Sequence, residues 1–124
     1  MDAFSVKQID SLPSTMHGAV KLAGDGLGVQ SFGLQVLDLP PAFPGYPAHD
    51  HAEDGQEEVY VVLAGSAEFE VGSERVDAGA GTMLRVDAVV RRTLVPGPDG
   101  VRILAIGCTP GGAYERPAAF RAKA

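Results

Sequence analysis

The chain has 124 residues, of which 45% are hydrophobic and 21% charged, and its formal net charge is −6. This length suffices for one domain with its own core, so we expect residues 1–124 to form a single domain. The acidic balance argues against nucleic acid or an anionic membrane as partner. A lone cysteine, Cys108, excludes an internal disulfide, and no signal peptide or membrane-spanning run is evident. We therefore expect a cytoplasmic protein.

Short elements joined by tight turns are expected, because 16 glycines and 9 prolines are spread along the chain. Weak apolar alternation in residues 1–12 predicts an edge strand, and residues 16–24 favour a short helical turn. Residues 29–39 alternate as a strand does. The proline-dense connector 40–47 ends that strand.

The second half of the chain is predicted to hold most of the sheet, in strands at 57–63, 67–71, 74–77, 82–86, 91–95 and 101–107. Gly72-Ser73 is typical of a two-residue hairpin turn, and residues 96–100 of a longer turn. About eight short strands without a convincing helix indicate an all-β barrel or sandwich.

The histidine pair His49 and His51 is the most informative stretch. In an extended segment residues i and i+2 point to the same side, so both imidazoles can face one metal ion. A carboxylate at the start of the next strand, Glu57 or Glu58, would complete the set. The alternative interpretation is a solvated acidic loop that merely precedes a strand.

The run from Gly45 to Gly65 resembles the first motif of the cupins: a glycine, His-x-His, and a carboxylate seven residues before a turn glycine. Residues 81–92 are similar to the second motif, a glycine turn and a strand followed by Pro-x-Gly-x-x-His. The resemblance covers roughly residues 29–107. It implies a small double-stranded β-helix, or jelly-roll barrel, with a divalent metal inside, and commonly a homodimer.

The first motif departs from the family's pattern in the spacing before the carboxylate. That residue usually follows the second histidine after three or four residues, whereas Glu58 follows His51 after six. Because a turn pins the register of its strand, we count from Gly65 and choose Glu58. Tyr60 and Val62 then share its face, which makes Tyr60 either a hydrogen-bonding group or a filler of the barrel.

The second motif departs further, since Asp87, Val89 and Arg92 stand where its proline, glycine and histidine would be. An arginine cannot lose its proton to coordinate a metal. Pointing inward, Arg92 would oppose a divalent ion and pair with Glu58. The predicted site therefore has either three protein ligands or none.

Two functions of different classes follow. The first is a divalent metal (Fe, Mn, Zn or Ni) held by His49, His51 and Glu58, without an organic cofactor, beside a small anionic metabolite that Arg92 and Tyr60 would contact. If such a protein is an enzyme, the resemblance implies a metal-dependent oxygenase or isomerase, and its catalytic residues stay open. The second is a metal-free binding or dimerisation module in which Glu58 pairs with Arg92.

Other residues receive simpler interpretations. His17 could be a remote fourth ligand, but a place on the surface is favoured. Cys108 ends an apolar strand and is expected to be a buried, inert thiol. Tyr114 and Phe120 are expected to fold back over the barrel, and Arg91 to face solvent.

Overall fold

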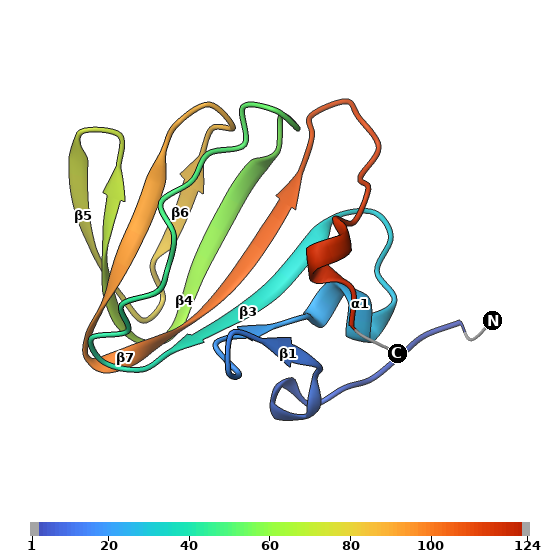
Figure 1. Cartoon of the computed structure of the whole chain (residues 1–124), viewed down its shortest axis with the longest axis horizontal. Helices are drawn as coiled ribbons and strands as arrows, with labels where there is room; N and C mark the ends of the chain where they lie inside the picture. Colours follow the sequence, from blue (N-terminus) through green and yellow to red (C-terminus); the bar gives the residue numbers. More distant parts are fainter. Residues whose placement is uncertain (1–2, 123–124) are drawn as a thin grey trace.

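The computed structural model describes residues 3–122, and its main body is one antiparallel sheet of seven strands that curves into a barrel (Figure 1). This confirms the predicted all-β jelly-roll fold, with seven strands rather than about eight. In chain order the elements are the 3-10 helix η1 (Ile9–Ser11), β1 (Ser14–Thr15), β2 (Val20–Lys21), α1 (Ala23–Leu27), β3 (Gly33–Leu39), β4 (Glu57–Val71), β5 (Glu74–Gly79), β6 (Met83–Val86), β7 (Arg92–Cys108) and the 3-10 helix η2 (Ala118–Phe120).

The sheet is built around β4, which pairs with β5, β6 and β7. The full strand order is β1-β2-β3-β7-β4-β5, with β6 beside β4. The predicted hairpin at Gly72-Ser73 is confirmed, because Val71 pairs with Glu74 across it. In the described residues no helix is long and apolar enough to cross a membrane.

The prediction of two strands at 57–63 and 67–71 was wrong, because both belong to the continuous strand β4. The pairing of β4 with β7 shifts register at two irregularities beside Gly65, which has a φ of 72°. Such bulges bend a strand and increase its twist without ending it. The glycine that suggested a turn therefore marks a corner of the barrel.

The same corner explains why 91–95 and 101–107 are one strand, β7, instead of two. Val101 pairs with Gly65 and Pro96 pairs with Ala67, so the predicted turn at 96–100 is an outward bulge opposite the bend in β4. Proline is tolerated at bulges because no ladder hydrogen bond is required there.

The N-terminal predictions also need correction. Within residues 1–12 the described part forms no edge strand but the single turn η1, and the helical turn expected at 16–24 begins later, as α1. The strand expected over 29–39 begins only at Gly33. Gly28, with a φ of 81°, ends α1 in the left-handed conformation, so the following residues form a loop before β3.

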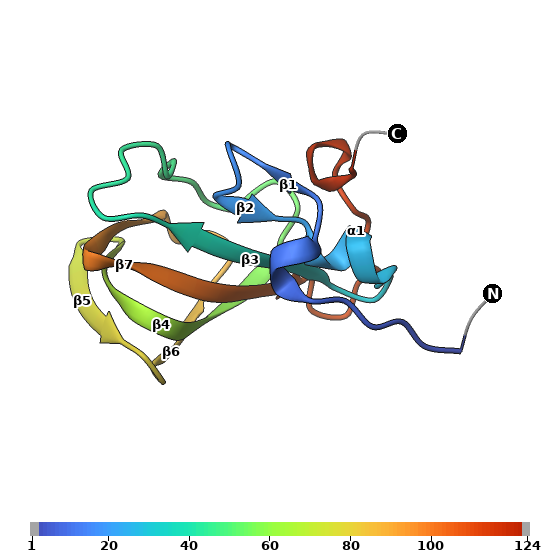
Figure 2. The same cartoon turned by 90° about the horizontal axis from the view of Figure 1, so that it is seen from below.

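The main core lies inside the barrel, where Tyr60, Val62 and Phe69 of β4 meet Leu94 and Ile103 of β7. Fully burying one such side chain contributes about 1.5–3 kcal/mol. A second, smaller cluster packs Val36 on the outer face of β3 against Leu12 and Ala23. The segments η1 and α1 therefore cover this face of β3 (Figure 2).

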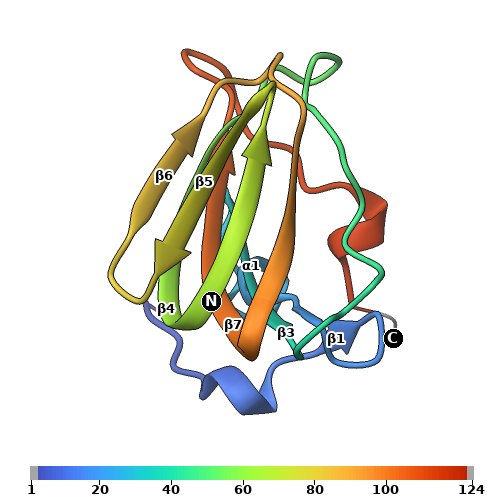
Figure 3. The same cartoon turned by 90° about the vertical axis from the view of Figure 1, so that its left-hand side faces the viewer.

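The connector between β3 and β4, residues 40–56, crosses one open side of the barrel (Figures 1 and 3). Reciprocal backbone hydrogen bonds tie it to the sheet, His49 N to Arg92 O at 2.9 Å and Arg92 N to His49 O at 2.8 Å. A third bond joins His51 N to Ala88 O at 2.7 Å. The histidine pair is thus held in an extended segment against the barrel.

Candidate metal centre

The side chains of His49, His51 and Glu58 converge inside the barrel mouth, each offering one ligand atom within 4.8 Å of the others. Glu58 Oε1 lies 3.2 Å from His51 Nε2 and 3.7 Å from His49 Nε2. The two imidazole rings stand nearly perpendicular, with centroids 5.2 Å apart. Donors from a loop and a strand therefore meet at one point, at a spacing that a single metal ion can bridge.

The strand register places Glu58 there. Glu58, Tyr60 and Val62 are buried, which confirms the face that the turn glycine predicts. Glu57 points away and pairs with the exposed Arg85 at 2.8 Å. The carboxylate of the site is thus Glu58 and not Glu57.

Both imidazoles are oriented through their Nδ1 atoms. His49 Nδ1 lies 3.2 Å from Pro47 O, and His51 Nδ1 lies 3.1 Å from both carboxylate oxygens of Asp54. Because carbonyl and carboxylate oxygens only accept hydrogen bonds, each Nδ1 carries the proton. The Nε2 atoms of both rings then face Glu58, and with a metal bound they would present their lone pairs to it, an arrangement typical of metal-ligating histidines.

Charges around Glu58 dominate the electrostatics. Burial by itself would raise the pKa of Glu58, but His49, His51 and Tyr60 together hold it well below its usual range. The Glu58 carboxylate raises the pKa of His51 above 6.5, with Asp54 acting in the same direction against the opposing effect of burial. Without a metal, Glu58 and His51 share a proton. A metal ion that binds at the centre must displace this proton from His51.

Tyr60 supports the carboxylate directly, since its hydroxyl donates a hydrogen bond of 2.7 Å to Glu58 Oε1. The ring is 1% exposed and packs on Phe69 with centroids 5.5 Å apart. Burial, together with the negative charge of Glu58, raises the pKa of Tyr60 far above its ordinary value. Tyr60 is therefore both a core residue and a positioning residue for Glu58.

Arg92 points into the barrel, where only 1% of it is exposed. Its Nη2 lies 3.5 Å from Glu58 Oε1, and its Nη1 donates to Val90 O at 2.9 Å. Among the described residues, none accepts a hydrogen bond from its Nε or Nη2. The guanidinium is thus an incompletely paired cation beside Glu58, at the sequence position where the resemblance to the second cupin motif implies a histidine.

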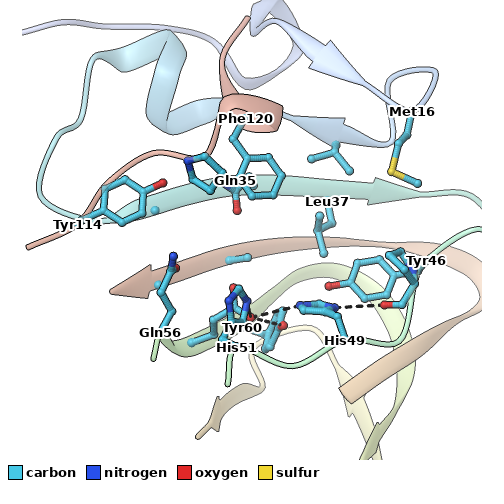
Figure 4. A pocket seen from close by; sticks show the side chains of 17 residues that line it. Met16, Gln35, Leu37, Tyr46, His49, His51, Gln56, Tyr60, Tyr114 and Phe120 are labelled. Atoms are coloured by element: carbon cyan, nitrogen blue, oxygen red, sulfur yellow. Dashed lines mark hydrogen bonds and ion pairs between the residues drawn. The ribbon is translucent and has the colours of Figure 1, made fainter. Parts of the chain in front are cut away.

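A cavity of about 220 Å³ opens beside the centre and is lined by His49, His51, Glu58 and Tyr60. Arg92 is not among its lining residues, so this structure gives it no direct contact with a ligand there. Figure 4 shows Tyr114, Phe120 and Met16 on the wall across from the histidines. The expectation that Tyr114 and Phe120 fold back over the barrel is confirmed.

Several residues of this region escaped the sequence interpretation. Asp54, which orients His51, lies in the acidic loop that the sequence shows, three residues after the histidine. Tyr46 lines the cavity and was visible only as an aromatic residue within the proline-rich connector. Gln35 and Met16 also line it, but no spacing signal connects them with the histidines.

The remaining candidates lie elsewhere. His17 is exposed at a φ of 56° and does not belong to the three-residue cluster. Cys108 is partly buried, and its Sγ lies 3.4 Å from Ser31 O. Arg91 is exposed, as expected.

Comparison with known proteins identifies the class to which this barrel belongs. A family model described as "Cupin domain" matches residues 35–107, and this chain belongs to that family. The matched segment begins in β3, includes all three candidate ligands and ends in β7. No curated protein matches the chain.

Solved structures support the fold. A cupin protein from Bacteroides fragilis is 18% identical, with a TM-score of 0.71 over 94% of this chain and 93% of that one. The plu4264 protein from Photorhabdus luminescens is 16% identical, with a TM-score of 0.63 over 86% and 88%. The DMSP lyase DddQ from Ruegeria pomeroyi is 25% identical, with a TM-score of 0.55 over 63% of this chain but only 38% of the lyase.

Proposed function

We propose that this protein binds a divalent metal through His49, His51 and Glu58 and takes a small anionic metabolite in the cavity beside it. The observation that carries the proposal is the orientation of the ligand atoms. Both Nε2 atoms face Glu58 Oε1, while both Nδ1 atoms are engaged by acceptors. A solvated loop would not need its histidines oriented in this way.

The donor set fits iron, manganese, zinc or nickel, because imidazole and carboxylate together suit borderline divalent ions. When bound, such an ion supplies Lewis acidity or, for iron, oxygen chemistry at its open positions. The chain itself contributes orientation. Tyr60 holds Oε1 of Glu58, Asp54 holds the ring of His51, and the cavity beside them takes the ligand.

Elemental analysis and thermal unfolding test the proposal together. The protein purified without added metal should carry close to one divalent ion per chain, and added metal should raise the Tm of the chelated protein. His51→Ala should abolish both effects. His17→Ala is the matched control, since His17 is exposed outside the cluster, and it should change neither. Absence of metal together with absence of a Tm shift would refute the proposal.

The second candidate, a metal-free binding module, is favoured by one observation, the buried guanidinium of Arg92 at 3.5 Å from Glu58. Two unit charges about 4 Å apart interact by about 4 kcal/mol at an effective dielectric of 20, so Arg92 can neutralise Glu58 without a metal. The same elemental analysis separates the candidates. The homodimer remains a prediction, which light scattering would test.

A further inference from the structure

The cavity has two chemically different walls (Figure 4). One carries the polar centre, with His49, His51 and Glu58. The other, across from it, is mostly apolar or aromatic and includes Met16, Leu37 and Phe120, with Gln35 and Tyr114 as its polar but uncharged groups. A ligand that fills this space therefore needs one polar end and one apolar body. The volume of about 220 Å³ lies below the 300–1,000 Å³ of typical drug-sized pockets, so that body is small, about the size of one ring.

The charge at the polar end selects an anion. A divalent ion and the Arg92 guanidinium would together carry three positive charges, against two negative charges, those of Glu58 and of Asp54, which contacts His51. Arg92 is 1% exposed, and its Nε and Nη2 find no acceptor within residues 3–122. Buried excess charge is costly unless it is neutralised, and a carboxylate on the ligand would neutralise it.

The apolar end excludes a second charge on the ligand. The described residues that line the cavity include no lysine and no arginine. A dicarboxylate would have to place its second anionic group on a wall where Gln35 and Tyr114 offer neutral donors and no cation balances the charge. One carboxylate therefore fits, and two do not.

The apolar wall is a fixed part of the structure, although Phe120 and Tyr114 come from the C-terminal segment beyond the family match. Arg116 anchors that segment, with its Nη1 3.6 Å from Asp25 and its Nη2 donating to Val29 O. Ala122 N adds a bond of 2.8 Å to Asp25 Oδ2. The segment is thus clamped to α1 and to the loop after it, which holds Phe120 over the cavity.

We propose that the cavity takes a small monocarboxylate with an apolar body of about one ring, its carboxylate at the His–Glu centre and its body between Leu37, Tyr46 and Phe120. This assignment rests on the proposed metal function and narrows it to a class of ligand.

Benzoate is the probe for the test, with three matched compounds. Acetate keeps the carboxylate without the body, benzyl alcohol keeps the body without the charge, and benzylamine reverses the charge. Metal content is measured first, and each compound is then titrated calorimetrically into metal-loaded protein. Benzoate should bind at least about tenfold more tightly than each of the other three.

Phe120→Ala should weaken benzoate binding at least about tenfold while leaving metal content and acetate binding unchanged. The control is Phe4→Ala, because Phe4 is 78% exposed and does not line the cavity. It should behave as the unmodified protein.

The outcomes separate the two proposals. Metal-loaded protein that binds benzyl alcohol as well as benzoate overturns the carboxylate assignment and leaves metal binding intact. Two results would overturn the role of the apolar wall. In one, metal-loaded protein binds acetate as tightly as benzoate. In the other, the Phe120→Ala variant keeps full affinity for benzoate. Protein that takes up no metal overturns the metal function and this assignment with it.

Discussion

Arg92 determines how strongly the centre can hold a metal, because its guanidinium lies 3.5 Å from the carboxylate that a metal would share. Arg92→His should place an imidazole where the family has its fourth ligand and remove a buried positive charge. We expect metal affinity to rise at least about tenfold. Competition with a fluorescent chelator measures this change.

Arg92→Met is the matched control, since it removes the charge without offering a ligand. It should tighten metal binding less than Arg92→His does. Equal affinities in the two variants would mean that repulsion, rather than the missing ligand, is what Arg92 contributes.

The Glu58–His51 pair makes the stability of the metal-free protein depend on pH. The folded-state pKa of His51 is raised above 6.5, so its protonated ring stabilises the fold fully below that pH and less as pH rises through the raised pKa. The folded-state pKa of Glu58 is lowered from 4.5, so its contribution is present above pH 4.5 and is lost as pH falls through the lowered pKa. Both residues therefore contribute their full stabilisation between pH 4.5 and pH 6.5.

Urea unfolding with a chelator present tests this dependence on His51→Gln. The variant should lose more free energy of unfolding relative to the unmodified protein at about pH 5.5 than at about pH 9. His17→Gln should show no such difference, because His17 lies exposed outside the pair. An equal loss at both values would contradict the assigned charge state.

At the residue scale, the sequence predicts on which face of a strand a side chain lies, because side chains alternate with a period of two. Glu58 could be chosen over Glu57 by its spacing from Gly65 in the motif, because a slip of one residue changes the face, although Gly65 forms a bulged corner and not a turn. The direction of Arg92 could not be predicted, because a long side chain in a strand can bury or extend its charged end. The roles of Asp54 and Tyr60 depend on hydrogen bonds that no spacing specifies.

At the scale of elements, the corner shared by β4 and β7 depends on glycine. Gly65 has a φ of 72°, and a Cβ there would lie 2.1 Å from Gly100 O, a backbone atom that cannot turn aside. Gly81 has a φ of 89° but nothing within 4 Å of such a Cβ. Gly81→Ala should cost about 1 kcal/mol of stability through strain alone, and Gly65→Ala about 3 kcal/mol or more.

Urea unfolding of the two variants measures the difference. Equal losses would mean that β7 moves away from Gly65 freely and that the corner is not tightly packed.

This corner also explains the misplaced strand boundaries. Glycine and proline signal a break in strand geometry, but a turn and a bulge have the same residue signals, and only the pairing of Gly65 with Val101 distinguishes them.

The N-terminal elements were the least predictable. Val36 and Leu37 of β3 both lie inside the protein, on opposite faces, because η1 and α1 cover the outside of that strand. The glycine-rich sequence of α1, Ala23–Leu27, gives it little intrinsic helix preference, so its place is set by packing that the sequence pattern does not show.

At the scale of the whole molecule, the proposed ion would join the connector to the barrel, because His49 and His51 lie in residues 40–56 and Glu58 in β4. Metal binding to the native state alone adds about 2.7 kcal/mol at a free concentration of about 100 times Kd. Chelation should therefore lower the Tm. It should also speed amide exchange selectively in the connector, while residues 101–107 of β7, which are paired on both sides, keep their protection.

Hydrogen exchange with mass spectrometry, with and without chelator, resolves these regions. His51→Ala should show fast exchange in the connector under both conditions, because it lacks a ligand. Acceleration spread evenly over connector and sheet would mean that the ion stabilises the barrel globally. No acceleration in a protein that releases its metal would mean that the backbone bonds of His49 to Arg92 and of His51 to Ala88 hold the connector in place without the ion.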